Sequence, residues 1–187
     1  MSSKINICCI ISEHYDSLRD SATGKYAPSD VFTFVLIPIF IAGFSVFFDV
    51  KLTNELIGLL VNFGSIITAL LLSVLVLVYD QRNKIDEKNS AAKPVSALQQ
   101  LKLGVLDQLF SNICYATIVS VSLVVTCFLE QMSRPTPVAA TQKIPGISCI
   151  EIIHGWILSP LIFFLIVHVI LTLLMVIKRM HTLLTSK

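Results

Sequence analysis

Charged residues are absent from four long stretches of the chain, and this absence sets its class. No Asp, Glu, Lys or Arg occurs within Val31–Phe48, Leu56–Tyr79, Ile113–Leu129 or Trp156–Ile177. Each stretch approaches or exceeds the roughly 20 residues that a helix needs to cross about 30 Å of hydrocarbon. A segment in lipid must satisfy its backbone hydrogen bonds internally, so all four are predicted to be helices. With 14% charged residues and a mean hydropathy of +0.81, the chain does not have the composition of a water-soluble domain.

The sequence also lacks the motifs of common catalytic and metal sites. Its five cysteines form no C-x-x-C pair and have no His at ligand spacing, so they are interpreted as small apolar residues. There is no Gly-rich phosphate loop. The nearest acid–base candidate is His14 with Glu13 and Asp16, which we interpret as a solvated helix face. We therefore expect no enzyme, no metal and no cofactor.

The four stretches predict an all-α, polytopic membrane protein built as a bundle of four transmembrane helices. Residues 1–29 form an amphipathic N-terminal segment, on which Ile7, Ile11, Tyr15 and Leu18 share one face. Residues 30–180 form the membrane domain, with spans at about 31–48, 56–79, 110–129 and 156–177 and a basic inner loop at 80–109. Residues 181–187 form a short tail. Pro38 and Gly43 are expected to kink the first span.

Two further expectations concern the inner loop. Tyr79–Ala97 is predicted to be a polar loop. The apolar spacing of Leu98, Leu101, Val105 and Leu109 then predicts a helix that lies at the membrane interface or extends the third span.

The distribution of positive charge predicts the orientation. Eleven of the fourteen Lys and Arg residues lie in the N-terminal segment, the loop between the second and third spans, and the C-terminal tail. Four spans place these three segments on one side, and the excess of positive charge marks that side as the cytoplasm. Both termini are therefore predicted to be cytoplasmic.

Polar or small side chains gather on one face of three spans. A lipid-facing Asn or His is costly, so these faces should meet other helices or water. They either pack helices together or line an aqueous path in an oligomer. The nine pore-lining candidates are Asn62, Ser65, Ser73, Ser111, Tyr115, Ser122, Thr126, His168 and Thr172.

His168 is the titratable group deepest in a span, and three interpretations remain open. It could be a neutral imidazole bonded to a neighbouring helix, or a gate or pH sensor. It could also ligate haem together with His154, which lies 14 residues away on the same face; that would require a second His-bearing helix from another copy. No carboxylate, Lys or Arg lies within any predicted span, which argues against an ion-coupled transporter.

The cations on the predicted cytoplasmic side have two interpretations. They are either a solvated topology signal near anionic lipid, or a regulatory site for an anionic nucleotide or oligonucleotide. The candidates for such a site are Arg19, Lys25, Arg82, Lys84, Lys88, Lys93, Lys102, Lys178 and Arg179.

The N-terminal region resembles the start of a group of small bacterial membrane proteins. The resemblance rests on Ile11–Asp20 (ISEHYDSLRD), on Thr23–Tyr26 (TGKY), on Ser29-Asp30 and on Pro38. It extends to the four-span layout with a charged inner loop. The group comprises membrane effectors of anti-phage defence loci, Hailong-type channel effectors among them. The resemblance implies an oligomeric channel in the bacterial inner membrane, shut by a partner or nucleic-acid ligand and opened during infection. It assigns no pore or ligand residue.

Two functions are therefore expected. The first is a homo-oligomeric channel or pore-forming effector, taken here as a tetramer, that is gated from the cytoplasmic side and depolarises the membrane in anti-phage defence. The alternative is a non-conducting anchor, assembly or immunity-type subunit that acts through a partner protein. The lipid bilayer is a partner in both cases.

Overall fold

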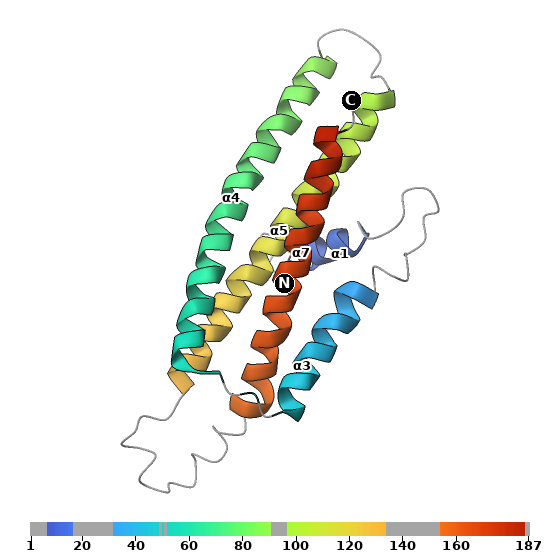
Figure 1. The fold of residues 1–187 in the computed structure, drawn as a ribbon. Helices are drawn as coiled ribbons and strands as arrows, with labels where there is room; N and C mark the ends of the chain where they lie inside the picture. The colour runs from blue at the N-terminus through green and yellow to red at the C-terminus, as the bar shows by residue number, and fades with distance from the viewer. Residues whose placement is uncertain are drawn as a thin grey trace, which may run out of the picture.

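The computed structural model describes residues 7–16, 32–48, 50, 52–90, 97–133 and 154–185. Every element within these ranges is a helix, which confirms the all-α prediction. In chain order (Figure 1), the elements are the helix α1 (Ile7–Asp16), the π-helical turn η1 (Phe32–Leu36), α3 (Ile37–Phe47), α4 (Asn54–Ser90), α5 (Ala97–Ser133), the π-helical turn η3 (His154–Leu158) and α7 (Ser159–Thr185).

Three helical segments are long and apolar enough to cross a membrane: Asn54–Glu87, Leu103–Ser133 and Trp156–Thr182. The chain is therefore a helical membrane protein. The first predicted span is apolar but shorter, at Phe32–Phe47. At 1.5 Å per residue this segment reaches at most about 24 Å, which is less than the roughly 30 Å of a hydrocarbon core. Four crossings thus remain a prediction.

The irregularity expected in the first span lies at its start. Pro38 is the second residue of α3, and because the chain before it is already helical, its missing N–H removes a helical hydrogen bond there. The π-helical turn η1 immediately precedes it. Gly43 lies inside α3, with open space around the position of a Cβ.

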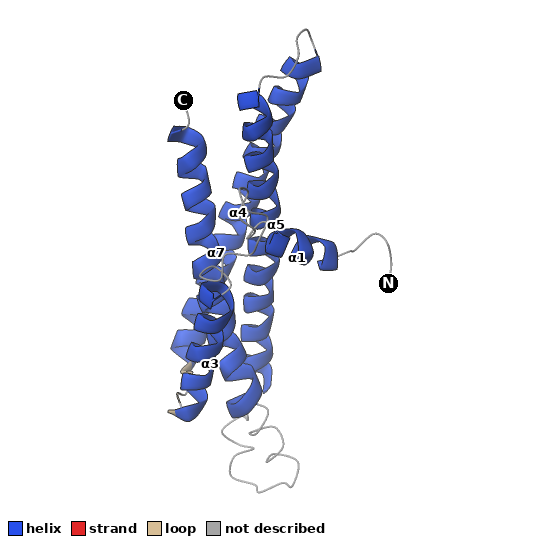
Figure 2. Ribbon diagram, turned by 90° about the vertical axis from the view of Figure 1, so that its right-hand side faces the viewer, coloured by secondary structure: helices blue, strands red, loops and turns tan. Residues whose placement is uncertain are grey.

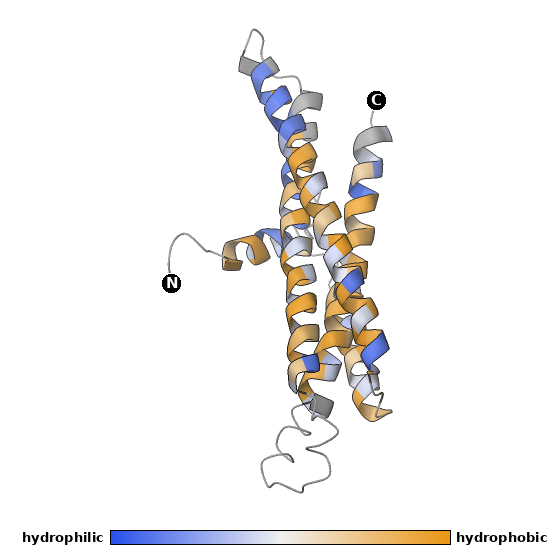
Figure 3. Ribbon diagram, turned by 90° about the vertical axis from the view of Figure 1, so that its left-hand side faces the viewer, coloured by the Kyte–Doolittle hydropathy of each residue, from blue (hydrophilic) through white to orange (hydrophobic). Residues whose placement is uncertain are grey.

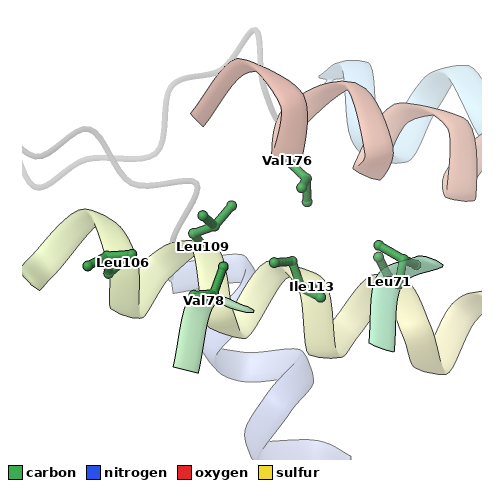
Figure 4. Close-up of a cluster of buried hydrophobic side chains, with 7 residues drawn as sticks. Leu71, Val78, Leu106, Leu109, Ile113 and Val176 are labelled. Carbon is green, nitrogen blue, oxygen red and sulfur yellow. The ribbon is translucent and has the colours of Figure 1, made fainter. Parts of the chain in front are cut away.

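The long helices lie side by side in the order α4, α5, α7 and α3 (Figure 1). Helix α5 packs against both α4 and α7, while α3 packs mainly against α7. One buried apolar cluster joins α4, α5 and α7, and Figure 4 shows its side chains gathered from the three helices. Its members are Leu71, Val78, Leu106, Leu109, Ile113, Ala116 and Val176. A second cluster holds α4, α5 and α7 together further along; its members are Leu52, Ile57, Leu60, Leu123, Cys127 and Ile162.

The prediction of a polar loop at 79–97 is wrong for most of its length. Helix α4 continues to Ser90, and α5 begins at Ala97 as an extension of the third span. The extension is helical because Ile85 packs on the first apolar cluster and Lys84 pairs with Asp80 one turn earlier at 2.6 Å. Arg82 also reaches Asp107 of α5 at 3.1 Å. We call this charged part, with the last turns of α7, the polar end of the protein.

Helix α1 lies crosswise to the long helices, at about half their height, with its N-terminal end pointing away from them (Figures 1 and 2). Figure 3 shows mostly apolar helix on both sides of this level, with the polar end further along on one side. Among the described elements α1 packs chiefly on α5.

Candidate functional site

A cluster of buried polar side chains lies where α1, η1, α5 and α7 meet. His14 is 0% exposed although it comes from a short helix outside the spans, and His168 of α7 is 2% exposed. Between them lie Asn112 and Tyr115 of α5, both buried. Residues three apart share a helix face, so Asn112 and Tyr115 both point at the junction. We call these four residues the junction cluster.

Two hydrogen bonds and a ring stack connect the four side chains. Nδ1 of His14 donates to Oδ1 of Asn112 at 2.8 Å. The imidazole of His14 lies parallel to the ring of Tyr115, with centroids 3.8 Å apart and an interplanar angle of 7°. A 2.6 Å hydrogen bond joins the Tyr115 hydroxyl to Nε2 of His168. An unbroken series of contacts therefore runs from α1 through α5 to α7.

Two further aromatic rings contact the junction cluster. Phe34 of η1 meets His14 and His168 edge-on, at centroid distances of 6.2 and 6.4 Å. Phe164 stacks on His168 with centroids 5.6 Å apart. Thr172, one turn after His168, donates to its carbonyl at 2.6 Å, so its hydroxyl is satisfied within α7.

Burial controls the charge of His14. Removal from water disfavours the imidazolium, and this lowers the pKa of His14 to about 4. The hydrogen bond to Asn112 acts in the opposite direction, while His168 and Arg179 add to the lowering. His14 is therefore neutral at pH 7. The prediction that it lies on a solvated helix face is wrong. Glu13 is exposed as predicted, and the side chain of Asp16 lies outside the described residues.

The three predicted polar stripes do not converge within one protomer. In α4, Asn62, Ser65 and Ser73 are all exposed, and the hydroxyl of Ser73 donates to the carbonyl of Ala69 in its own helix. The candidates on α5 and α7 instead turn inward. Buried there are Ser111, Tyr115, Thr126, His168 and Thr172, and Ser122 is half-buried.

Two of the candidate hydroxyls on α5 bond within their own helix. Ser122 donates to the carbonyl of Ile118 and Thr126 to that of Ser122, at 2.8 and 2.7 Å. These two bonds lie within one helix, and the choice between helix packing and an aqueous path stays a prediction. Only the α4 stripe is available to line a path between protomers.

A closer helix contact went unnoticed in the sequence. Gly64 of α4 faces α5 so closely that a Cβ there would lie 2.7 Å from Cγ2 of Val124. The hydroxyl of Ser120 donates to the Gly64 carbonyl at 2.9 Å and lies 3.0 Å from Oγ1 of Thr68. Small and hydroxyl residues of this kind bring membrane helices together.

The candidate anion-binding cations are largely engaged or undescribed. Arg82 and Lys84 pair with Asp107 and Asp80. Arg179 donates to Oε1 of Gln108 at 3.2 Å, and Lys178 is exposed. Outside the described residues or side chains lie Arg19, Lys25, Lys88, Lys93 and Lys102. Of the four cations whose side chains are described, Arg82, Lys84 and Arg179 have partners within the chain.

The metal and haem alternatives concern His154 and His168. Among the described residues no three His, Cys, Asp or Glu side chains lie close enough to hold a metal ion. Nε2 of His168 bonds Tyr115. His154 begins η3, and its side chain lies outside those described.

Sequence reasoning missed several buried polar residues, among them His14, Asn112 and Glu130. His14 lies 98 positions from its partner Asn112, so no local spacing could have joined them. Asn112 directly follows Ser111 of the predicted stripe, and a wider stripe would have included it. Glu130, one residue beyond the predicted third span, is only 3% exposed. The apolar run ends at Leu129, so no pattern in the sequence indicated that Glu130 is buried.

No family model, no curated protein and no solved structure matches the chain. The fold and the junction cluster define a class, a helical membrane protein in which a crosswise N-terminal helix is joined to the spans by buried polar contacts.

Proposed function

We propose that the chain forms a homo-oligomeric channel, a pore-forming effector with four spans and both termini in the cytoplasm of a bacterium. The proposed oligomer is a tetramer. Opening would depolarise the inner membrane, and the resemblance of the N-terminal region supports a role in anti-phage defence. The excess of Lys and Arg around the termini and between α4 and α5 supports the orientation.

The observation that carries this proposal is the exposed polar face of α4. Gly58, Asn62, Ser65 and Ser73 recur along one side of the helix, and all four are exposed. Helix α4 is also the least covered span, since 17% of its most apolar window is buried, against 50% for α5. An amide facing hydrocarbon is unfavourable. The face is best satisfied by water or by α4 of a second copy.

Control from the cytoplasmic side is supported by the resemblance and by the exposed Lys178. An inhibitory nucleotide or oligonucleotide would be the ligand, or else a partner protein from the same locus. Several of the candidate cations already have partners within the chain.

The test compares Asn62→Leu with Leu70→Ala in liposomes that report ion flux and dye leakage. Both positions are exposed on α4, but Leu70 lies off the polar face. Each lost contact of Asn62 should weaken the association of protomers by about 1 kcal/mol, which is about fivefold in the dissociation constant. We expect Asn62→Leu to lower ion flux and shift the size distribution in detergent, and Leu70→Ala to change neither. Equal flux from both variants would contradict a path along α4.

A non-conducting anchor or immunity-type subunit is the second candidate. It is favoured by the inward-turned stripes of α5 and α7, which pack inside one protomer. In that case the bilayer stays tight even after nuclease and high-salt treatment, and the protein co-purifies with a partner chain. Asn62→Leu would then reduce recovery of that partner.

A further inference from the structure

Among the described residues, it is mainly the last part of α1 that other elements cover. His14 is fully buried, and Ile10 is half-buried against the cluster of Tyr115, Val119 and Val169. Toward the free end, Ile7 is 43% and Ile11 37% exposed. The first half of the helix therefore extends past the flank of the long helices, as Figure 2 shows.

The exposed isoleucines lie on the same face as the docked residues. At about 100° per residue, Ile7, Ile10, Ile11 and His14 fall within about 100° of one another. The opposite face carries Cys9, Ser12 and Glu13, all exposed, and Sγ of Cys9 donates to the Glu13 carboxylate at 3.3 Å. The apolar face that docks on α5 thus continues outward beyond the protein.

A helix of this length needs support along its whole apolar face. Isolated helices shorter than about 12–15 residues are marginal in water, and α1 has 10 residues. The junction cluster holds only its last turn. The described elements leave Ile7 and Ile11 exposed.

The position of α1 identifies the covering surface. The ring of His14 meets Phe34, which lies in the first turn of the apolar segment Phe32–Phe47. The apolar face of α1 therefore points toward the start of the apolar segment Phe32–Phe47. The helix lies crosswise to the long helices at this level (Figure 3), and an amphipathic helix that crosses a bundle in this way can lie in the plane of a bilayer surface.

We propose that α1 is an in-plane membrane-surface helix, whose Ile7 and Ile11 insert among lipid chains beside the protein while His14 anchors its other end between α5 and α7. The partner is the lipid surface itself. A change in lipid packing or surface charge that lifts the free end of α1 acts directly on the contacts from His14 to His168. The proposal does not depend on ion conduction.

Spin labels on the two faces of α1 test the proposal. Each label is attached to a single cysteine at position 7, 9, 11 or 12, with all other cysteines replaced by alanine. The protein is placed in nanodiscs of phosphatidylethanolamine and phosphatidylglycerol. Labels at 7 and 11 should be accessible to oxygen and shielded from a water-soluble nickel reagent, at a depth of about 5–10 Å. Labels at 9 and 12 should show the reverse.

Two results would overturn it. Equal accessibility to the nickel reagent at all four positions would place α1 in water. Shielding of positions 7 and 11 from both reagents would show that protein, such as a second copy, covers them.

Hydrogen exchange of unlabelled protein provides an independent measurement. The variant Ile7→Ser/Ile11→Ser should lose about tenfold or more of the amide protection of α1 in nanodiscs. The matched control Cys8→Ser/Ser12→Ala, on exposed positions of the same helix, should keep it. Unchanged protection in the isoleucine variant would refute a lipid contact.

Discussion

Acidification should release α1 from the long helices, because His14 is buried in its neutral form. The pKa of His14 is lowered from 6.5 to about 4 when α1 is docked. The undocked helix therefore binds a proton more readily than the docked one. Docking is fully favourable above about pH 6.5 and weakens as the pH falls toward 4.

The size of the effect follows from the shift. Between pH 7 and pH 4 the docking equilibrium should fall about a hundredfold, or about 3 kcal/mol. The titratable and charged groups around His14 are Tyr15 on its own helix, Tyr115 of α5, and His168 and Arg179 of α7. Among the side chains of η1 it meets the uncharged ring of Phe34.

Amide hydrogen exchange of residues 7–16, corrected for the intrinsic pH dependence of exchange, measures this equilibrium directly. His14→Phe is the decisive variant, because it keeps a ring against Tyr115 and cannot be protonated. The variant should lose about 1 kcal/mol of the free energy of docking, because the bond to Asn112 is missing. The amide protection of its α1 should not vary between pH 7 and pH 4. His181→Ala removes an exposed imidazole of α7 and should behave as the wild type. If protection in the wild type and in His14→Phe fell in parallel, His14 would not be the responsible group.

Two further predictions concern packing between the spans. Gly64→Ala should lower the free energy of unfolding by about 1–3 kcal/mol, because the new methyl group would lie 2.7 Å from Val124. Gly43→Ala, with open space around it, is the control. The reaction of the buried Cys127 thiol with a fluorogenic maleimide during heating measures the stability of both variants. Equal midpoints would mean that Val124 rotates away at no cost. Tyr115→Phe should cost about 1–3 kcal/mol in the same assay, since it leaves His168 without its hydroxyl partner, while the ring stack and the protection of α1 persist. Loss of that protection would show that the hydroxyl is needed for docking.

The helical class of the protein could be predicted because it depends on composition. An uncharged stretch of sufficient length has few alternatives to a helix in lipid, and three of the four expected spans are present at that length. The helical stretch 80–90 could not be predicted from hydropathy. Its stability comes from pairs such as Arg82–Asp107, which require knowing that α5 runs alongside.

The candidate site was predicted only where residues share a helix. The spacing of Tyr115 along α5 and of His168 and Thr172 along α7 identified inward faces. The position of His14 depended on how α1 folds back over α5, and a single sequence gives no signal of that contact. The polar stripe of α4 was clear in the sequence, but its residues are exposed in the protomer, so the structure does not show what they contact outside it.

The length of α4 has a mechanical consequence. The helix runs unbroken from Asn54 to Ser90, and after Gly64 it contains neither Gly nor Pro, the residues at which helices most often bend. It therefore behaves as a stiff rod, about 55 Å long at 1.5 Å per residue. A molecule that grips the polar end and twists it by one residue's angular step turns Asn62 through a similar angle, from one neighbour toward another. Rotation of the charged end of α4 about the helix axis would therefore change the surface that Asn62 faces.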